Sequence, residues 1–446
     1  MNKNPLTIVI LAAGKGTRMK SNMPKVMHRL AYLPMIGWVL KNAEALKPKK
    51  IIVVVGPDMP ALEAACKPHT CVVQAVRNGT AGAVKAALPA LKNVKGDVVV
   101  LLGDTPLVTP QTIKGLIKAR GKAGISVLGM RLSDPSGYGR LVMNKDGSLQ
   151  KIVEHKDASA AERKIDTVNT GAFCIDGASL ERWLGKVKNN NAQKEYYITD
   201  LPEIAAREGV ATHVALTADP DEVKGCNSHS DLAALEATLQ DRLRTQALQS
   251  GVCMHHPSSV FLAHDTKFAP GVVIEPHVVF GPGVSVGEGS TIKAFSHLED
   301  TKIGKEASIG PFARLRPGAD IGDAVRIGNF VEVKKSKIGK GSKINHLAYV
   351  GDTDMGADVN FSAGAITVNY DGFDKHKTKI GKGVMVGSNV NLVAPVKIGD
   401  GAFIAAGSTI TKDVPKDALA VARDAAKVIK GWAASYRKKK SKAKKK

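Results

Sequence analysis

Phosphate binding is the first chemistry that the side chains of this sequence suggest. An apolar run ends in Leu11-Ala12-Ala13-Gly14-Lys15-Gly16-Thr17-Arg18-Met19, and Pro24-Lys25 follows shortly afterwards. Glycines let backbone N–H groups approach a phosphate, and Arg18 and Lys25 add charge-assisted donors. The common fingerprints do not fit, because a dinucleotide site needs a third glycine where Met19 stands and a P-loop needs Gly-Lys-Ser/Thr. The segment therefore predicts a phosphate-binding turn of another class.

A carboxylate at the end of a buried strand is a candidate metal ligand. Gly103-Asp104 follows the apolar run from Val98 to Leu102. Ligands of open α/β sheets collect at the carboxyl ends of strands, and a hard carboxylate oxygen suits Mg²⁺. Gly-Asp is also a common turn pair, so the residues by themselves favour an ordinary strand-end turn.

A second group of polar residues recurs further along the chain at the spacing of one coil. Arg316 and Lys334 would stack on one face of a solenoid with about eighteen residues per coil, where both could hold one phosphate. His346 is a candidate general base, with Glu332 holding its tautomer and raising its basicity. The group predicts acid–base chemistry next to a bound phosphate.

The element that would carry this second group is an apolar ladder of period six. From Phe268 to Ile410 an apolar side chain recurs at every sixth position. A helix repeats near 3.6 residues and a strand at 2, so this period predicts a prism of short strands and corners. Gly often follows the apolar residue, as in Ile303-Gly304, which suits a corner crowded by the neighbouring coil. A plain prism could be a scaffold without chemistry.

The ladder has interruptions that predict a binding surface. It slips to five-residue steps at Leu298 to Ile303, Val333 to Ile338 and Val350 to Met355. It breaks between Phe361 and Ile380, where the polar segment 368–377 predicts a loop expelled from the repeat. Loops expelled from repeats are where binding surfaces form.

The first half of the chain alternates strand-like and helix-like segments, which predicts an α/β domain with a mostly parallel sheet. A charged, Ala- and Leu-rich helix follows, with Ser230 as its expected N-cap and Gly251 as its stop. We expect domains at residues 1–229 and 251–424, a helical linker at 230–250, and a short helix with a disordered lysine-rich tail at 425–446.

Composition limits the classes of partner. The net charge is +23, but eight of the last ten residues are Lys or Arg, and +15 remains without them. Aromatic residues make up 4%, so base-stacking platforms and nucleic-acid binding are not expected. Five cysteines without paired or metal-type spacing indicate a reducing compartment. No apolar stretch reaches eighteen residues, so we expect a cytoplasmic enzyme without a membrane span.

Several further segments carry a resemblance to a known family. The chain resembles the bifunctional bacterial enzymes that combine glucosamine-1-phosphate N-acetyltransferase and N-acetylglucosamine-1-phosphate uridylyltransferase activities, which together make UDP-N-acetylglucosamine for the cell envelope. The matching segments are Gln74 with Gly79-Thr80, Gly103-Asp104-Thr105-Pro106-Leu107, Gly137-Tyr138-Gly139-Arg140, Ile152-Val153-Glu154-His155-Lys156, Asn169-Thr170-Gly171, Asn191-Ala192-Gln193, Glu195-Tyr196-Tyr197-Ile198-Thr199-Asp200 and Gly225-Cys226-Asn227.

The resemblance implies a Rossmann-like nucleotidyltransferase domain followed by a left-handed parallel β-helix that forms a homotrimer. It implies Mg²⁺ on Asp104 and Asn227, with UTP and acetyl-CoA as co-substrates. The catalytic residues would be Arg18, Lys25, His346 and Glu332. UTP and UDP-N-acetylglucosamine would contact Leu11, Ala12, Ala13, Gly14, Lys25, Gln74, Gly79, Thr80, Leu102, Gly103, Asp104, Gly139, Glu154, Asn169 and Asn227. The amino-sugar phosphate would contact Arg316, Lys334, Tyr349 and Asn360, and acetyl-CoA would contact Ala363, Asn369, Tyr370, Ser388, Ala406 and Arg423.

Two departures from the family pattern concern nucleotide packing. Leu102 stands where Tyr is usual before Gly-Asp, and Gly82 stands where His is often found. The charged groups expected to do the chemistry are all present.

Three functions remain open at this point. A bifunctional enzyme needs both polar groups, whereas a nucleotidyltransferase with a purely structural prism predicts an uninterrupted ladder. A regulatory subunit of the same architecture predicts loss of the charged groups. The expelled loop and the presence of Arg18, Lys25, Asp104 and Asn227 favour the bifunctional enzyme.

Overall fold

The structure is a computed structural model that describes residues 4–443. The chain forms two compact units, Met1–Leu243 and Arg244–Lys446, which divide within helix α7 (His229–Gln249). The domain boundaries expected from the sequence stay a prediction.

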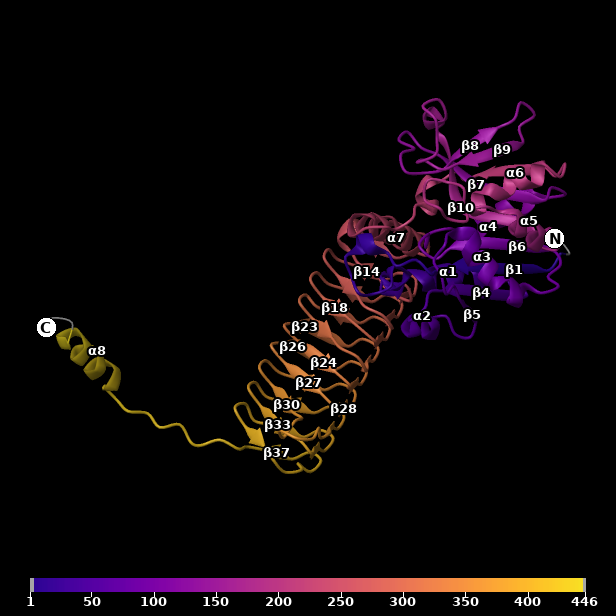
Figure 1. The fold of residues 1–446 in the computed structure, drawn as a ribbon. Coiled ribbons are helices and arrows are strands. Elements are labelled where there is room, and N and C mark those ends of the chain that lie inside the picture. The colour runs from indigo at the N-terminus through magenta and orange to yellow at the C-terminus, as the bar shows by residue number, and fades with distance from the viewer. Residues whose placement is uncertain (1–3, 444–446) are drawn as a thin grey trace. The chain divides into compact units, whose positions relative to one another are not determined.

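The first unit is built around a nine-stranded sheet with strand order β11-β7-β10-β6-β1-β4-β5. β10 runs antiparallel to β6 and β7, the other neighbours on this path are parallel, and the β8–β9 hairpin pairs with β10 (Figure 1). The strands are β1 (Leu6–Leu11), β4 (Lys50–Val55), β5 (Thr70–Val73), β6 (Asp97–Leu102), β7 (Ile125–Arg131), β8 (Arg140–Met143), β9 (Leu149–Val153), β10 (Thr167–Asp176) and β11 (Thr212–Leu216).

Helices and a small hairpin complete this unit. The α-helices are α1 (Met35–Glu44), α2 (Pro60–Ala65), α3 (Thr80–Ala87), α4 (Pro110–Arg120), α5 (Gly177–Lys186) and α6 (Leu201–Ala206). The hairpin is β2 (Arg29–Leu30) with β3 (Leu33–Pro34), and the 3₁₀ turns are η1 (Thr17–Met19), η2 (Lys25–Met27), η3 (Leu88–Leu91), η4 (Glu162–Lys164), η5 (Ile198–Asp200) and η6 (Pro220–Val223).

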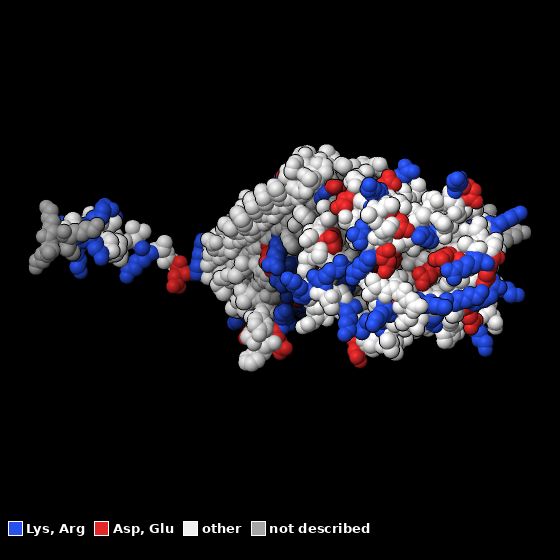
Figure 2. All heavy atoms as spheres, turned by 45° about the horizontal axis from the view of Figure 1, so that its top comes forward, with Lys and Arg blue, Asp and Glu red and all other residues white. Residues whose placement is uncertain are grey.

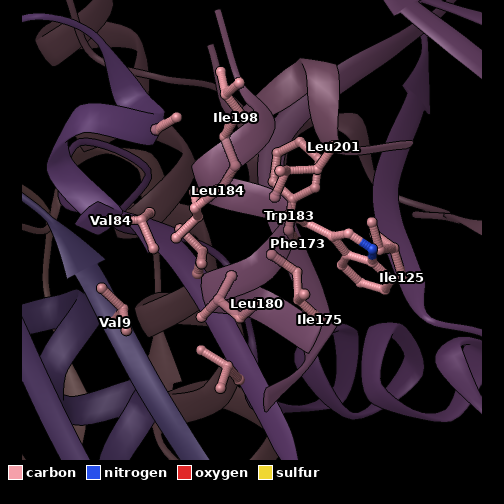
Figure 3. Close-up of a cluster of buried hydrophobic side chains, with 14 of the residues drawn as sticks. Val9, Val84, Ile125, Phe173, Ile175, Leu180, Trp183, Leu184, Ile198 and Leu201 are labelled. Carbon is pink, nitrogen blue, oxygen red and sulfur yellow. The ribbon is translucent and has the colours of Figure 1, made fainter. Parts of the chain in front are cut away.

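The core lies on both faces of the sheet. Successive side chains of a strand point to opposite faces, so Val9 and Val100 join one cluster while Ile8 and Val99 join the other. Around Trp183, Figure 3 shows the first cluster converging from strands and helices. Because both faces are covered, the central strands can be apolar along nearly their whole length. The predicted α/β fold is confirmed.

Helix α7 begins earlier than its expected N-cap. Ser228 Oγ accepts a hydrogen bond from Asp231 N at 3.2 Å, and Asp231 Oδ2 accepts from Asn227 N and Ser228 N, both at 2.9 Å. The reciprocal bonds are those of a capping box, which satisfies the free N–H groups of the first turn. The expectation that Ser230 is the N-cap was therefore wrong.

The second unit is a parallel β-helix with three sheets, opened by β12 and the 3₁₀ turn η7 (Pro257–Ser259). One sheet contains β12 (Cys253–Met254), β14 (Val273–Ile274), β17 (Thr291–Ile292), β20 (Ser308–Ile309), β23 (Arg326–Asn329), β26 (Lys343–His346), β29 (Asn360–Phe361), β32 (Met385–Val386), β35 (Phe403–Ile404) and β37 (Leu419–Ala420). The second contains β13 (Lys267–Phe268), β16 (Ser285–Val286), β19 (Thr301–Ile303), β22 (Ala319–Ile321), β25 (Lys337–Ile338), β28 (Thr353–Met355), β31 (Thr378–Ile380) and β34 (Val396–Ile398). The third contains β15 (Val279–Phe280), β18 (His297–Leu298), β21 (Arg314–Leu315), β24 (Glu332–Lys334), β27 (Tyr349–Gly351), β30 (Ile366–Val368), β33 (Asn391–Val393) and β36 (Thr409–Ile410).

The six-residue ladder forms the core of this prism. Ile292, Ile309 and Ile327 are fully or almost fully buried and pair in register from coil to coil. Corner glycines are needed because the next coil is close: a Cβ on Gly339 would lie 2.4 Å from the carbonyl carbon of Gly356. The ladder thus supplies the buried core that holds successive coils in register.

The ladder takes one further step after Phe361 before the loop expected at 368–377. Thr367 takes the inward position six residues after Phe361 and is 1% exposed. Its Oγ1 accepts from Gly351 N at 2.8 Å, so a hydroxyl can replace an apolar side chain there. The expelled segment therefore lies between β30 and β31, where Tyr370 and Lys375 form a β-bridge.

The C-terminal helix α8 (Trp432–Ala443) covers much of the segment that was expected to be disordered. Ala, Lys and Arg are strong helix formers, which accounts for its extension through Arg437 and the lysines that follow. The last three residues of the expected tail lie outside the described part of the chain. Between residues 4 and 443, no helix is both long and apolar enough to cross a membrane.

Two candidate active sites

A cavity opens at the carboxyl ends of the central strands of the first unit. Four further residues, which the sequence analysis did not select, share its wall: Val26, Arg77, Ala83 and Glu195. The expected nucleotide-binding residues that line it are Leu11, Ala12, Ala13, Gly14, Lys25, Gln74, Gly79, Thr80, Leu102 and Asp104.

The ammonium of Lys25 lies between the two expected metal ligands. Lys25 Nζ donates to Asp104 Oδ2 and to Asn227 Oδ1, the latter at 3.2 Å, and Arg18 Nη2 donates to Asn227 Oδ1 at 2.8 Å. The side chains of Lys25 and Asp104 are 13% and 18% exposed, so water screens this pair weakly. Two side-chain oxygens thus converge on one cationic group.

These residues fit a Mg²⁺ ion that takes some of its ligands from the protein and the others from a substrate. In the described residues, no group of three or more His, Cys, Asp or Glu could hold a metal. Mg²⁺ commonly takes one or two carboxylates from the protein and its other ligands from water and phosphate. Asp104 and Asn227 would supply the protein oxygens.

The expected sugar-binding residues lie together on the β8–β10 side of the sheet. Asn169 N donates to Gly139 O at 2.8 Å, and a Cβ on Gly139 would lie 3.4 Å from both carboxylate oxygens of Glu154. Glu154 accepts from Thr199 Oγ1 at 3.2 Å. Burial raises the pKa of Glu154, and nearby Asp157 adds to the effect.

A hydrogen bond connects this cluster with the cavity. Ile198 N donates to Thr80 Oγ1 at 3.0 Å, and Ile198 is next to Thr199, the partner of Glu154. A Cβ on Gly171 would lie 2.5 Å from Leu102 Cδ1, so Leu102 packs directly on the bulge in β10 that follows Asn169. The expected sugar residues are therefore linked to the cavity wall, although they do not line the cavity themselves.

In the second unit, a cluster of cations forms a candidate phosphate site. Arg316 N donates to Val333 O at 2.8 Å, which places Arg316 beside Lys334 on the next coil. Lys375, from the expelled loop, lowers the pKa of Lys334 most strongly, and Arg316 and Lys335 add to the effect. Cations that repel one another in this way favour a bound anion. The sequence analysis missed Lys375, although its loop was singled out.

Glu332 does not hold His346, which corrects the sequence-based expectation. Glu332 Oε1 accepts from Arg316 Nη1 at 2.7 Å, and its Oε2 is 3.7 Å from Arg314 Nη1. His346 Nδ1 instead lies 3.0 Å from Asn329 Oδ1, its partner in the β23–β26 register. Because an amide oxygen can only accept a hydrogen bond, Nδ1 of His346 carries the proton that Asn329 Oδ1 accepts. Nε2 of His346 is then left as the basic nitrogen.

Polar residues of two adjacent coils surround the start of the expelled loop. Asn369 Nδ2 donates to Asp352 Oδ2 at 2.5 Å and lies 3.5 Å from Tyr349 Oη. Tyr370 Oη donates to Gly372 O at 2.6 Å within the loop. Asn360 Nδ2 donates to Ser362 Oγ at 3.1 Å and to Met385 Sδ at 3.0 Å, so its contacts are with its own strand end and the next coil rather than with the loop.

Four of the expected acetyl-CoA residues, Ala363, Ser388, Ala406 and Arg423, form a line along one corner of the prism, whereas Asn369 and Tyr370 lie at the expelled loop. The backbone of the residue after Ser388 donates to Ala363 O, and the residue after Ala406 donates to Ser388 O, both at 2.8 Å. Arg423 Nη1 donates to Ala406 O at 2.6 Å and extends the line to the last coil. An elongated ligand could lie along this corner.

Fold and sites together define a nucleotidyltransferase domain joined to a hexapeptide-repeat transferase domain. Residues 8–164 match the model of the MobA-like NTP transferase domain, and residues 300–335 and 377–412 match that of the bacterial transferase hexapeptide (six repeats). The three sheets therefore form the expected left-handed parallel β-helix.

Full-length relatives then identify the family. The chain is 47% identical to the bifunctional protein GlmU of Paramagnetospirillum magneticum, with 98% of each chain covered. It is 49% identical to those of Xanthobacter autotrophicus, with 100% of each covered, and Bradyrhizobium diazoefficiens, with 99% of each covered. The chain belongs to the bifunctional GlmU family. The predicted pair of activities, acetylation of glucosamine 1-phosphate and uridylyl transfer to N-acetylglucosamine 1-phosphate, is confirmed at this level.

Proposed function

We propose that the cavity of the first unit carries out uridylyl transfer and the cation cluster of the second unit carries out acetyl transfer. The observation that supports this division best is the convergence of Lys25, Asp104 and Asn227 on one point of the cavity. A purely structural strand-end turn at Asp104 does not account for a cation held between two oxygens.

In uridylyl transfer, an oxygen of N-acetylglucosamine 1-phosphate attacks the α-phosphorus of UTP and pyrophosphate leaves. This chemistry needs charge neutralisation and alignment more than a covalent nucleophile. Lys25 and Arg18 would neutralise the phosphates, while Glu154 and Asn169 orient the sugar. Mg²⁺, held by Asp104 and Asn227, would supply further charge neutralisation when bound.

In acetyl transfer, the amine of glucosamine 1-phosphate attacks the thioester carbon of acetyl-CoA, and free CoA leaves. Nε2 of His346 would take the proton from the amine while Asn329 holds the ring. Arg316, Lys334 and Lys375 would bind the sugar phosphate. The transfer is direct, so no cysteine nucleophile is required.

We also propose that the β-helix forms a homotrimer in the cytoplasm. The support is an exposed stack in which the rings of Phe295, Phe312 and Phe330 lie 5.0 and 5.3 Å apart on successive coils. These side chains are 53%, 45% and 57% exposed, an apolar row of a kind that marks an interface. Phe330 follows Asn329 directly, so further copies of the chain would lie beside His346.

The bound partners would be small molecules. On the face seen in Figure 2, Lys and Arg are interspersed with Asp and Glu rather than gathered in one continuous basic surface, which does not favour nucleic acid. The five cysteines are all free, as a reducing compartment requires.

A paired-substrate assay tests the proposal. Purified protein with Mg²⁺ should release CoA from acetyl-CoA when glucosamine 1-phosphate is present, and should make UDP-N-acetylglucosamine once UTP is added. If glucose 1-phosphate and dTTP are far better substrates, the substrate assignment is wrong. Light scattering of the chain and of a Phe312→Glu variant measures the oligomeric state, and a wild-type monomer contradicts the trimer.

A further inference from the structure

The amide of Gln74 is held in one orientation inside the nucleotide cavity. Gln74 is 5% exposed, and its backbone N donates to Val55 O at 2.8 Å. Its Nε2 donates to Asn78 Oδ1 and to Gly79 O, both at 3.2 Å. The two amide hydrogens are thus committed to the protein. Gln74 Oε1 remains as an acceptor in a cavity wall.

The side chain of Asn78 can take this position because residue 82 has no side chain. A Cβ on Gly82 would lie 1.8 Å from Asn78 Oδ1 and 2.7 Å from Asn78 Cγ, far inside contact distance. The backbone of Asn78 cannot move aside easily, since its carbonyl accepts from Tyr196 N at 2.8 Å. Gly82 therefore leaves the space in which Asn78 reaches Gln74.

The orientation of a buried amide decides which base it can pair with. Uracil has a donor at N3, whereas cytosine has an acceptor at the same position. An amide that presents its oxygen suits uracil, and the same amide turned over presents its NH₂ group and suits cytosine. Sites that match buried hydrogen-bonding groups discriminate strongly, because the wrong partner leaves those groups unpaired.

We propose that Asn78, in the space left by Gly82, fixes the Gln74 amide so that the site selects uracil nucleotides over cytosine nucleotides. Asn78 acts through Gln74 and is a positioning residue for specificity. The inference rests on the proposed function, which places UTP in the cavity that Gln74 lines.

The test compares the kcat/KM of UTP with that of CTP in the full chain, with N-acetylglucosamine 1-phosphate as acceptor. Asn78→Leu removes the acceptor and should lower the UTP/CTP ratio by about 10- to 100-fold, the range for one buried hydrogen bond. Gly82→Ala should lower the ratio in the same direction, because its methyl group displaces Asn78. Asn78→Asp keeps an acceptor for Gln74 Nε2 and should hold the ratio within about 3-fold of wild type.

Matched controls separate specificity from damage to the fold. The exposed Asn189→Leu change should leave the ratio unaltered. A purely structural role for Asn78 would lower turnover of both nucleotides equally, so an unchanged ratio in Asn78→Leu overturns the proposal. A wild-type protein that uses neither UTP nor CTP contradicts the uridylyl site itself, and a wild type that prefers CTP contradicts the orientation assigned to Gln74.

Discussion

The two sites solve the problem of binding phosphate in opposite ways. In the first unit, strand ends and loops enclose Lys25 with Asp104, and both side chains are largely shielded from water. In the second unit, Arg316 is 33% exposed and stands on an open face with Lys334 and Lys375. Enclosure strengthens the attraction of each charge for a phosphate, whereas an open stack relies on several charges acting together.

The acidic groups follow the same contrast. At the enclosed site, burial raises the pKa of Glu154, and beside it burial raises the pKa of Asp200, a neighbour of Glu154 and Asp157, to about 6. On the expelled loop, backbone N–H groups and His376 lower the pKa of Asp371. Desolvation therefore controls the pKa of the acidic groups at the first site, and local hydrogen bonds control it on the loop at the second. Mutations that affect only one of the two sites should show this difference.

The largest effect should come from the base of the open site. His346→Ala removes the group that accepts the amine proton and should lower acetyl transfer by about 10²- to 10⁴-fold. Uridylyl transfer from added N-acetylglucosamine 1-phosphate should be unchanged. Both reactions are measured on one preparation, with the exposed His297→Ala as control. Loss of both activities, or of neither, removes His346 from the mechanism.

A variant of the enclosed site should separate the two activities in the opposite direction. Lys25→Ala removes a shielded cation and leaves Asp104 without its partner, so uridylyl transfer should fall by about 10²- to 10³-fold while acetyl transfer persists. Lys15→Ala changes an exposed lysine of the same turn that does not line the cavity. If the two variants are equally impaired, general positive charge rather than the position of Lys25 matters.

A smaller effect should come from the residue that orients His346. Asn329→Ala should lower kcat for acetyl transfer by about 10-fold, because the ring loses the partner of Nδ1. Asn329→Asp places a carboxylate at Nδ1 and should raise the pKa seen on the acidic limb of the pH–rate profile. An unshifted profile in Asn329→Asp would show that Asn329 does not contact the ring during turnover. Uridylyl transfer serves as the internal reference.

Coil length identifies the correct partner of His346. Counting eighteen residues per coil correctly placed Arg316 beside Lys334. The coil that includes the five-residue step from Val333 to Ile338 has seventeen, which brings Asn329 opposite His346. The short step was visible in the sequence, so counting it would have found Asn329.

Other features depended on information that periodicity does not contain. The strand-end rule led to Asp104, but its contact with Lys25 depends on the course of the intervening turn. Arg77 donates to Ala13 O at 2.5 Å across the cavity, and neither residue type nor spacing marked it. The sequence thus predicted the fold and most of the expected cavity wall, whereas the contacts made by long polar side chains needed the structure.

The smallest effect tests whether desolvation controls the enclosed site. Burial raises the pKa of Asp200 from 3.8 to about 6, with Glu203, Glu154 and Asp157 contributing. A carboxyl with a raised pKa in the folded state binds its proton more tightly there than in the unfolded chain. Its contribution to stability is therefore full below about pH 4 and is lost as pH rises through about 6.

Asp200→Asn removes this pH-dependent loss. The variant should unfold about 2–4 °C higher than wild type at pH 8, which corresponds to about 1 kcal/mol after allowing for partial exposure, and the two proteins should converge near pH 4. Calorimetry across this pH range measures the difference, and the exposed Asp166→Asn provides the matched control. A difference that stays constant with pH would mean that Asp200 acts through packing and hydrogen bonds, and that burial does not set the charge balance of the enclosed site.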